Sequence, residues 1–137
     1  AQEHHVMLLL KPHGGISSLA EDLLRARQRL AHPSFGICYD PGNIYYYTGR
    51  PAEEDLPKVA GQVKAMCIKD EVNGKHGEVM ITPGTGLVDF RRIFAMLADV
   101  GFSGPCWVEC LGGKSLAEIN EEAKKTYQFI AEIAANT

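Results

Sequence analysis

Several features that define other protein classes are missing from this sequence. No apolar run approaches the ~20 residues that a transmembrane helix needs, and lysines and arginines form no run of the kind that binds nucleic acid. The first residues lack the basic and apolar regions of a signal peptide. The four cysteines form no CxxC pair, so a zinc ribbon or a thioredoxin-like site has no support. We therefore expect a cytoplasmic protein that binds neither membranes nor nucleic acid.

The residues that are present have the composition of an ordinary folded domain. The 137 residues carry a formal net charge of −3, and 45% of them are hydrophobic and 23% charged. This length is sufficient to bury one core. We expect a single domain over residues 1–137.

Short apolar segments alternate with segments of helical character along the chain. The first apolar segment is an unbroken run, and we expect it to be a strand buried on both faces, as parallel strands are. The expected strands span residues 6–10, 35–40, 63–68 and 105–109. The expected helices begin at Ser17 or Ser18 and, further along, span residues 51–62, 89–100 and 116–134.

This alternation predicts an α/β fold of four consecutive βα units with parallel strands. Four strands leave two open sheet edges, which closure into an eight-stranded barrel removes. We therefore expect half of a (β/α)8 TIM barrel, completed by dimerisation or by a missing N-terminal half. A half-barrel exposes an apolar inner face that needs a partner, so we expect a homodimer or association with another half-barrel. The expected members of that face are Leu8, Leu10, Ile37, Met66 and Trp107.

Ionisable side chains stand where each expected strand ends, at the edge where βα barrels place their functional groups. Most of them have an ordinary explanation as well. Asp40 and Asn43 suit a turn, and Cys67 suits a core. The neighbours Lys69 and Asp70 suit an exposed ion pair of little energetic value. Glu109 is the hardest to explain structurally, because a Glu within an apolar strand is rarely buried without a partner.

Such a set of side chains suits the movement of a proton on a sugar. Facing carboxylates can hold Mg²⁺ or Mn²⁺, and a metal ion held there stabilises an enediolate while a nearby base moves the proton. Asp40, Glu109 and His13 are candidates for part of that site. Lys11 adds a positive charge instead, which would repel a metal ion or neutralise a carboxylate.

Five motifs together resemble the C-terminal half of the xylose-isomerase-like sugar phosphate isomerase/epimerase family. The resemblance covers nearly the whole chain and is specific for the family, although it names no substrate. The motifs are Leu8 to Gly15, Gly36 to Asn43, Cys67 to Asp70, Pro83 to Phe90, and Gly101 to Gly104 with Trp107 to Glu109.

The resemblance implies an isomerase or epimerase that acts on a sugar or sugar phosphate by proton transfer. It implies metal ligands at Asp40, Cys67 and Glu109 for Mn²⁺, Mg²⁺ or Zn²⁺. It also implies catalytic roles for Glu109 and Lys11, and the substrate-binding residues that it implies are His13, Asn43 and Lys69.

The chain departs from the family's pattern at four positions. Lys11 stands where the family has a Glu, and Cys67 stands where it has a His. Asn43 replaces a second His, and Thr85 replaces a Glu. Three interpretations stay open: an altered metal site, a lysine that itself acts as a base or forms a Schiff base, or a site without metal and without catalysis. In the last case the chain would bind carbohydrate or serve as an assembly partner.

Overall fold

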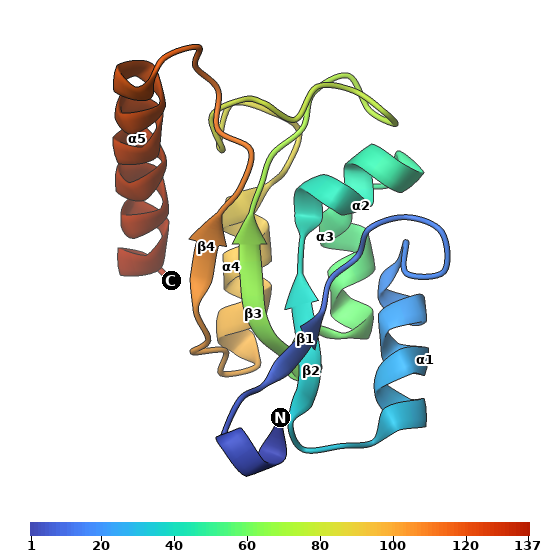
Figure 1. The fold of residues 1–137 in the computed structure, drawn as a ribbon. Coiled ribbons are helices and arrows are strands. Elements are labelled where there is room, and N and C mark those ends of the chain that lie inside the picture. Colours follow the sequence, from blue (N-terminus) through green and yellow to red (C-terminus); the bar gives the residue numbers. More distant parts are fainter.

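The structure is a computed structural model that describes all 137 residues. Its centre is one parallel sheet with the strand order β1-β2-β3-β4 (Figure 1). The strands are β1 (Leu8–Leu10), β2 (Phe35–Tyr39), β3 (Val63–Ile68) and β4 (Cys106–Val108). The α-helices are α1 (Ala20–Leu30), α2 (Pro41–Thr48), α3 (Ala52–Asp55), α4 (Phe90–Asp99) and α5 (Leu116–Ala135), and short 3₁₀ helices cover Gln2–His4, Leu56–Lys58 and Ala60–Gln62.

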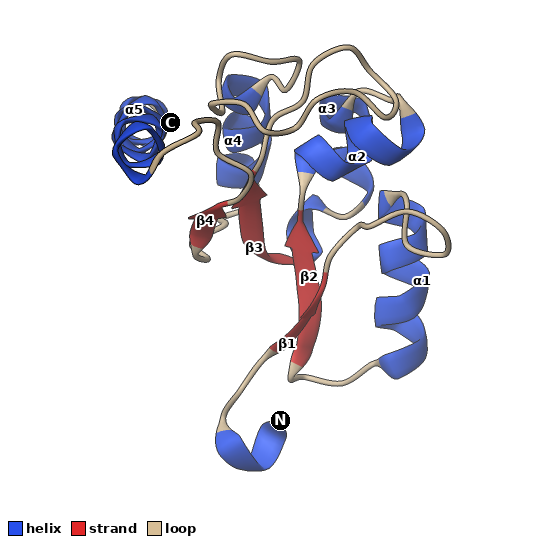
Figure 2. Ribbon diagram, turned by 45° about the horizontal axis from the view of Figure 1, so that its top comes forward, coloured by secondary structure: helices blue, strands red, loops and turns tan.

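These elements confirm the prediction of four βα units and a half-barrel. Figure 2 shows α1, α3, α4 and α5 arranged around the outer side of the sheet, whereas no helix covers its opposite face. That opposite face corresponds to the interior of a closed barrel. None of the helices is long and apolar enough to cross a lipid bilayer.

The two faces of the sheet have different buried residues. Side chains of β2 and β3 that point toward the helices join the main hydrophobic core of 18 buried residues, among them Ile37 and Met66. The prediction that Leu8, Leu10, Ile37 and Met66 lie on the inner face is therefore wrong. Alternation along each strand turns Ile37 and Met66 outward, Leu10 also packs against this core, and Leu8 shares the face of Leu10 in β1. The inner face instead carries a small cluster of Cys38, Ala65 and Cys67, with Leu9 packed against it.

The edge strands are more exposed than predicted. In β1, the side chain of Leu8 is 62% exposed, and in β4 Trp107 and Val108 are 41% and 40% exposed. The expectation that the first strand is buried on both faces is wrong, because β1 pairs only with β2 and has no neighbour on its other side.

Local chemistry explains where the helices begin. Ser115 caps α5 with its side chain and Glu118 closes the capping box, and Asp89 caps α4. Helix α1 begins later than predicted, because Asp22 rather than Ser17 or Ser18 accepts hydrogen bonds from the free amides at its start.

The predicted helix over residues 51–62 is broken into α3 and two 3₁₀ helices, with Pro57 inside the first 3₁₀ turn. Proline lacks the amide hydrogen that a continuing α-helix requires.

Candidate functional site

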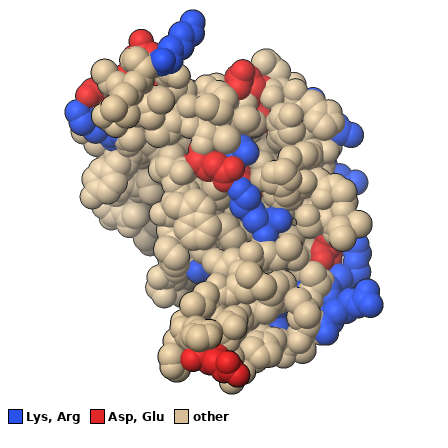
Figure 3. Space-filling model, in the orientation of Figure 1, with Lys and Arg blue, Asp and Glu red and all other residues tan.

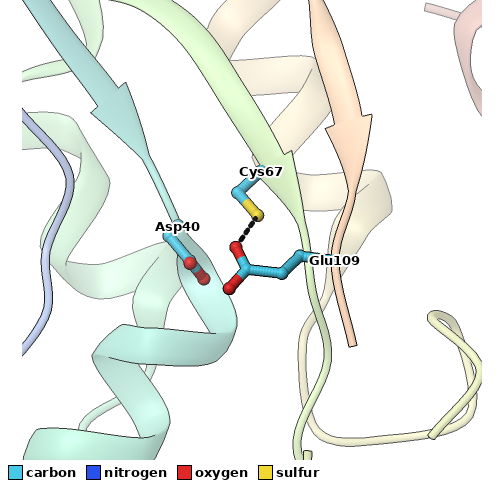
Figure 4. A group of neighbouring side chains, drawn as sticks. All are labelled: Asp40, Cys67 and Glu109. Carbon is cyan, nitrogen blue, oxygen red and sulfur yellow. Dashed lines mark hydrogen bonds between the residues drawn. The ribbon is translucent and has the colours of Figure 1, made fainter. Parts of the chain in front are cut away.

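Four side chains from four neighbouring strands meet at the carboxyl edge of the sheet. Lys11, Asp40 and Glu109 follow the ends of β1, β2 and β4 directly, and Cys67 is the second-last residue of β3. Figure 4 shows Asp40, Cys67 and Glu109 pointing toward one another. One potential ligand atom from each of these three residues lies within 4.8 Å of the other two. The structure thus brings together the three predicted metal ligands.

Asp40 is held in this position by the start of α2. Its Oδ1 accepts a hydrogen bond from the backbone amide of Asn43 at 2.9 Å, so Asp40 is the N-cap of the helix, and Pro41 occupies the first helical turn. Gly42 allows α2 to approach β3 closely, because a Cβ atom at that position would lie 2.7 Å from the carbonyl oxygen of Lys69. The Asp-Pro-Gly-Asn sequence is therefore a helix start rather than an isolated turn.

Lys11 joins the two carboxylates of the site. Its Nζ lies 3.1 Å from Oδ2 of fully buried Asp40 and also contacts Oε2 of Glu109. Burial alone would lower the pKa of Lys11, but the contacts with Glu109 and Asp40 outweigh it and raise that pKa. Burial raises the pKa of Asp40, and the charge of Lys11 opposes the rise. Lys11 is therefore an ammonium ion enclosed by two acids.

Glu109 is the most accessible carboxylate of the group, with 37% of its side chain exposed. The Cys67 thiol donates a hydrogen bond to its Oε2 at 3.1 Å, and Nζ of Lys69 lies 3.7 Å from its Oε1. Burial opposes ionisation of Glu109, but Lys11 and Cys67 outweigh it and lower the pKa of this carboxyl. Burial raises the pKa of Cys67, and the neighbouring acids raise it further, so this residue is a neutral thiol at physiological pH.

The three residues predicted to bind substrate lie in different environments. His13 is exposed, and the hydroxyl of Tyr47 lies 3.2 Å from its Nδ1. Lys69 is almost buried beside Glu109. Asn43 is buried and its side-chain amide donates to the carbonyl oxygen of Pro12 at 2.8 Å, which ties α2 to the loop after β1. Sequence reasoning missed Tyr47, which lies in α2.

Asp70 differs from its prediction as part of an exposed ion pair. It is fully buried, and its carboxylate accepts hydrogen bonds from the backbone amides of Glu71, Gly84, Gly86 and Val88. Gly86 fits there because a Cβ atom would lie 2.4 Å from the Asp70 carboxylate. Asp70 therefore organises the long connection between β3 and α4, which begins right beside Cys67 and Lys69.

The arrangement of these groups disfavours a divalent metal ion. Oxygen ligands from Asp40 and Glu109 would have to converge on the ion, but both already contact the ammonium group of Lys11. The third donor, Cys67, directs its S–H toward Glu109. A metal ion would therefore have to displace Lys11 and deprotonate a buried thiol.

The wider surface has no single dominant charge. On the face seen in Figure 3, acidic and basic side chains form small separate groups, in line with a net charge of −3.

Comparison with known proteins places this site in a family. An inosose dehydratase of Serratia proteamaculans (strain 568) is 28% identical in an alignment of 116 positions that covers 72% of this chain and 39% of the relative. The chain thus spans about two fifths of the length of the curated relatives that it matches.

Solved structures show the same fold. D-psicose 3-epimerase from Clostridium cellulolyticum H10, solved with D-tagatose, matches with a TM-score of 0.79 at 14% identity, over 96% of this chain and 50% of its own. A xylose isomerase-like TIM barrel protein from Mycobacterium smegmatis in complex with magnesium matches with a TM-score of 0.76 at 20% identity, over 96% and 46%. The family model for the xylose isomerase-like TIM barrel matches residues 1–133. This match confirms the resemblance: the chain belongs to the xylose isomerase-like TIM barrel family.

Proposed function

We propose that the chain carries the reactive half of an enzyme that moves a proton on the carbon next to a carbonyl group of a sugar or cyclic polyol. The observation that carries the proposal is the position of Glu109, a partly exposed carboxylate beside Lys11 and Cys67 at the carboxyl edge of the sheet. Ketose epimerisation next to the carbonyl and dehydration of a ketopolyol share one first step, which is removal of such a proton. The names of the relatives fit this shared step.

The proposed roles follow from the position of each group. Glu109 accepts the proton from carbon, and the electrons of the broken C–H bond move to the carbonyl oxygen and form an enolate. Lys11 donates a hydrogen bond to that oxygen and balances its charge. As Lys11 turns toward the substrate, its contact with Glu109 weakens, which makes Glu109 a stronger base.

We propose binding roles for three other residues. Lys69 lies beside Glu109 and can donate to a hydroxyl or phosphate oxygen of the substrate. His13 lies exposed at the same edge with Tyr47. Asn43 supports the loop that carries His13 through its bond to Pro12.

Deuterium exchange tests this proposal without knowledge of the final product. The protein is incubated in D₂O with a 2-ketohexose or with inosose, and deuterium at carbons next to the carbonyl is followed by NMR. We expect exchange in the wild type and a loss of about 100-fold or more in Glu109→Gln, the usual range for a lost general base. Glu121→Gln, on the exposed surface of α5, is the matched control and should keep wild-type exchange. Exchange that persists in Glu109→Gln would refute the assigned role.

The contact between Lys11 and Glu109 favours a second candidate function. It lowers the pKa of the carboxyl and thereby weakens Glu109 as a base, which suits a carbohydrate-binding protein without catalysis. Sugar binding measured by calorimetry, together with an absence of exchange in the same sample, would favour this alternative.

A further inference from the structure

The carboxyl edge of the sheet has the geometry of a cation site. Three acidic or thiol groups from β2, β3 and the end of β4 converge, and their ligand atoms lie within 4.8 Å of one another. Two of them are carboxylates, of which Asp40 is fully buried. A buried carboxylate oxygen requires a hydrogen-bond donor or a positive partner, and Oδ2 of Asp40 has no hydrogen-bond partner.

That partner is present within the chain. Nζ of Lys11 lies 3.1 Å from Oδ2 of Asp40 and contacts Oε2 of Glu109, so one ammonium group serves both acids. The contact with Asp40 is an ion pair without hydrogen-bond alignment, because Oδ2 has no hydrogen-bond partner. A second ammonium, that of Lys69, lies 3.7 Å from the other oxygen of Glu109.

We propose that the Lys11 ammonium is the resident cation of this site and takes the place of a divalent metal ion. The two acids contribute two negative charges, and Lys11 and Lys69 contribute two positive charges at contact distance. A divalent ion between the same acids would lie beside both lysines and would be repelled by them. The site thus supplies from its own sequence the positive charge that polarises a substrate oxygen.

This inference rests on the proposed function for its chemical meaning, because it names the group that would stabilise the enolate. The position of the Lys11 ammonium between Asp40 and Glu109 does not depend on that function and can be tested by metal binding alone. Failure of the metal experiment would leave proton transfer by Glu109 standing, and failure of the exchange experiment would leave the cation assignment standing.

The test is a titration of the 137-residue chain with Mn²⁺, followed by EPR of the free ion. We expect no stoichiometric site in the wild type and no change in its melting temperature upon addition of Mn²⁺ or EDTA. Lys11→Glu replaces the ammonium by a ligand, so we expect one Mn²⁺ per chain with an affinity at least about 10- to 100-fold higher than that of the wild type. This gain should disappear in the double variant Lys11→Glu/Asp40→Asn.

Two further variants separate the effect of the Lys11 charge from that of an added acid and from that of a charge change elsewhere. Lys11→Gln removes the charge without adding a third acid, so it avoids the repulsion among three acids in Lys11→Glu. It should bind Mn²⁺ at least about tenfold more tightly than the wild type. Lys64→Glu makes the same charge change on the exposed part of β3 near its opposite end and should bind no better than the wild type. One Mn²⁺ per wild-type chain that is lost in Asp40→Asn would overturn the inference, as would a failure of both Lys11 variants to gain affinity.

Discussion

Buried carboxylates shape this protein at the scale of single residues, and Asp55 shows the effect away from the site. Its Oδ2 accepts a hydrogen bond from the amide of Ala20 at 2.8 Å and thereby holds the start of α1. The hydroxyl of Tyr39 lies 3.4 Å from the same oxygen. Its Oδ1 is buried without a hydrogen-bond partner. Burial raises the pKa of Asp55, and the Ala20 amide and Lys58 oppose the rise.

This shift predicts a pH dependence for Asp55→Asn. Because the folded-state pKa of Asp55 is higher than its ordinary value, the folded state binds the proton more tightly than the unfolded state does. The stability that this provides is complete below the ordinary value of 3.8 and is lost as the pH rises through the raised folded value.

Asparagine keeps an oxygen for Ala20 and has no such titration. Urea unfolding at a series of pH values should therefore show wild-type stability falling relative to Asp55→Asn as the pH rises through this window. Asp99→Asn, at the exposed end of α4, controls for the loss of one carboxylate. A relative stability of the wild type that rises with pH would contradict the sign of this argument.

At the scale of single elements, the start of α2 fixes the position of Asp40 in the site. The sequence predicted the residues of this segment but not the helix. Asp40 and Asn43 were identifiable as residues at a strand end, but turn chemistry and helix capping use the same residue types. The helix is decided by tertiary contact, since Gly42 packs against the backbone of Lys69. A pattern of single residues cannot reveal that approach.

Gly42→Ala should therefore distort the site. Its Cβ would meet the Lys69 carbonyl oxygen at 2.7 Å, which is backbone and cannot move aside as a flexible side chain does. We expect a loss of about 1–3 kcal/mol in the free energy of unfolding, the usual cost of overpacking. Gly61→Ala is the matched control, because nothing lies within 4 Å of its added Cβ. Urea unfolding followed by fluorescence of Trp107, the sole tryptophan, measures both. Equal effects of the two substitutions would contradict the packing argument.

At the scale of the whole molecule, the sequence predicted the βα order because strands and helices have clear periodic patterns. It also predicted the edge of the sheet at which the polar residues gather. It did not predict which atoms touch. Lys11 and Glu109 are 98 residues apart, and they meet only because four strands lie side by side and end at the same edge of the sheet. It also did not distinguish the edge strands from the central ones, since both are apolar runs.

The open edges lead to a proposal about assembly. For this 137-residue chain in solution we propose a second copy as the partner, because four parallel strands from each of two copies complete the eight of a barrel and cover exposed Trp107, which pairs with inner-face Cys67. This chain matches 50% of the length of the solved D-psicose 3-epimerase chain, so two copies have the length of one such chain.

Light scattering coupled to gel filtration tests the assembly. We expect a mass twice the 15.0 kDa of one chain at micromolar concentration. Trp107→Lys should shift the mass toward one chain, whereas Ile16→Lys, at a loop residue that is 97% exposed, should not. A wild-type mass of a single chain would contradict the proposal.

The central claim is that the Lys11 ammonium is held between Asp40 and Glu109, and NMR of the lysine side chains tests it most directly. A ¹H–¹⁵N correlation spectrum selects ammonium groups that exchange slowly with water because they are enclosed and bound. We predict a protected ammonium signal that disappears in Lys11→Met, remains in Lys64→Met, and shows coupling through the hydrogen bond to the carboxylate carbon of Glu109. A spectrum in which no protected signal depends on Lys11 would contradict the account.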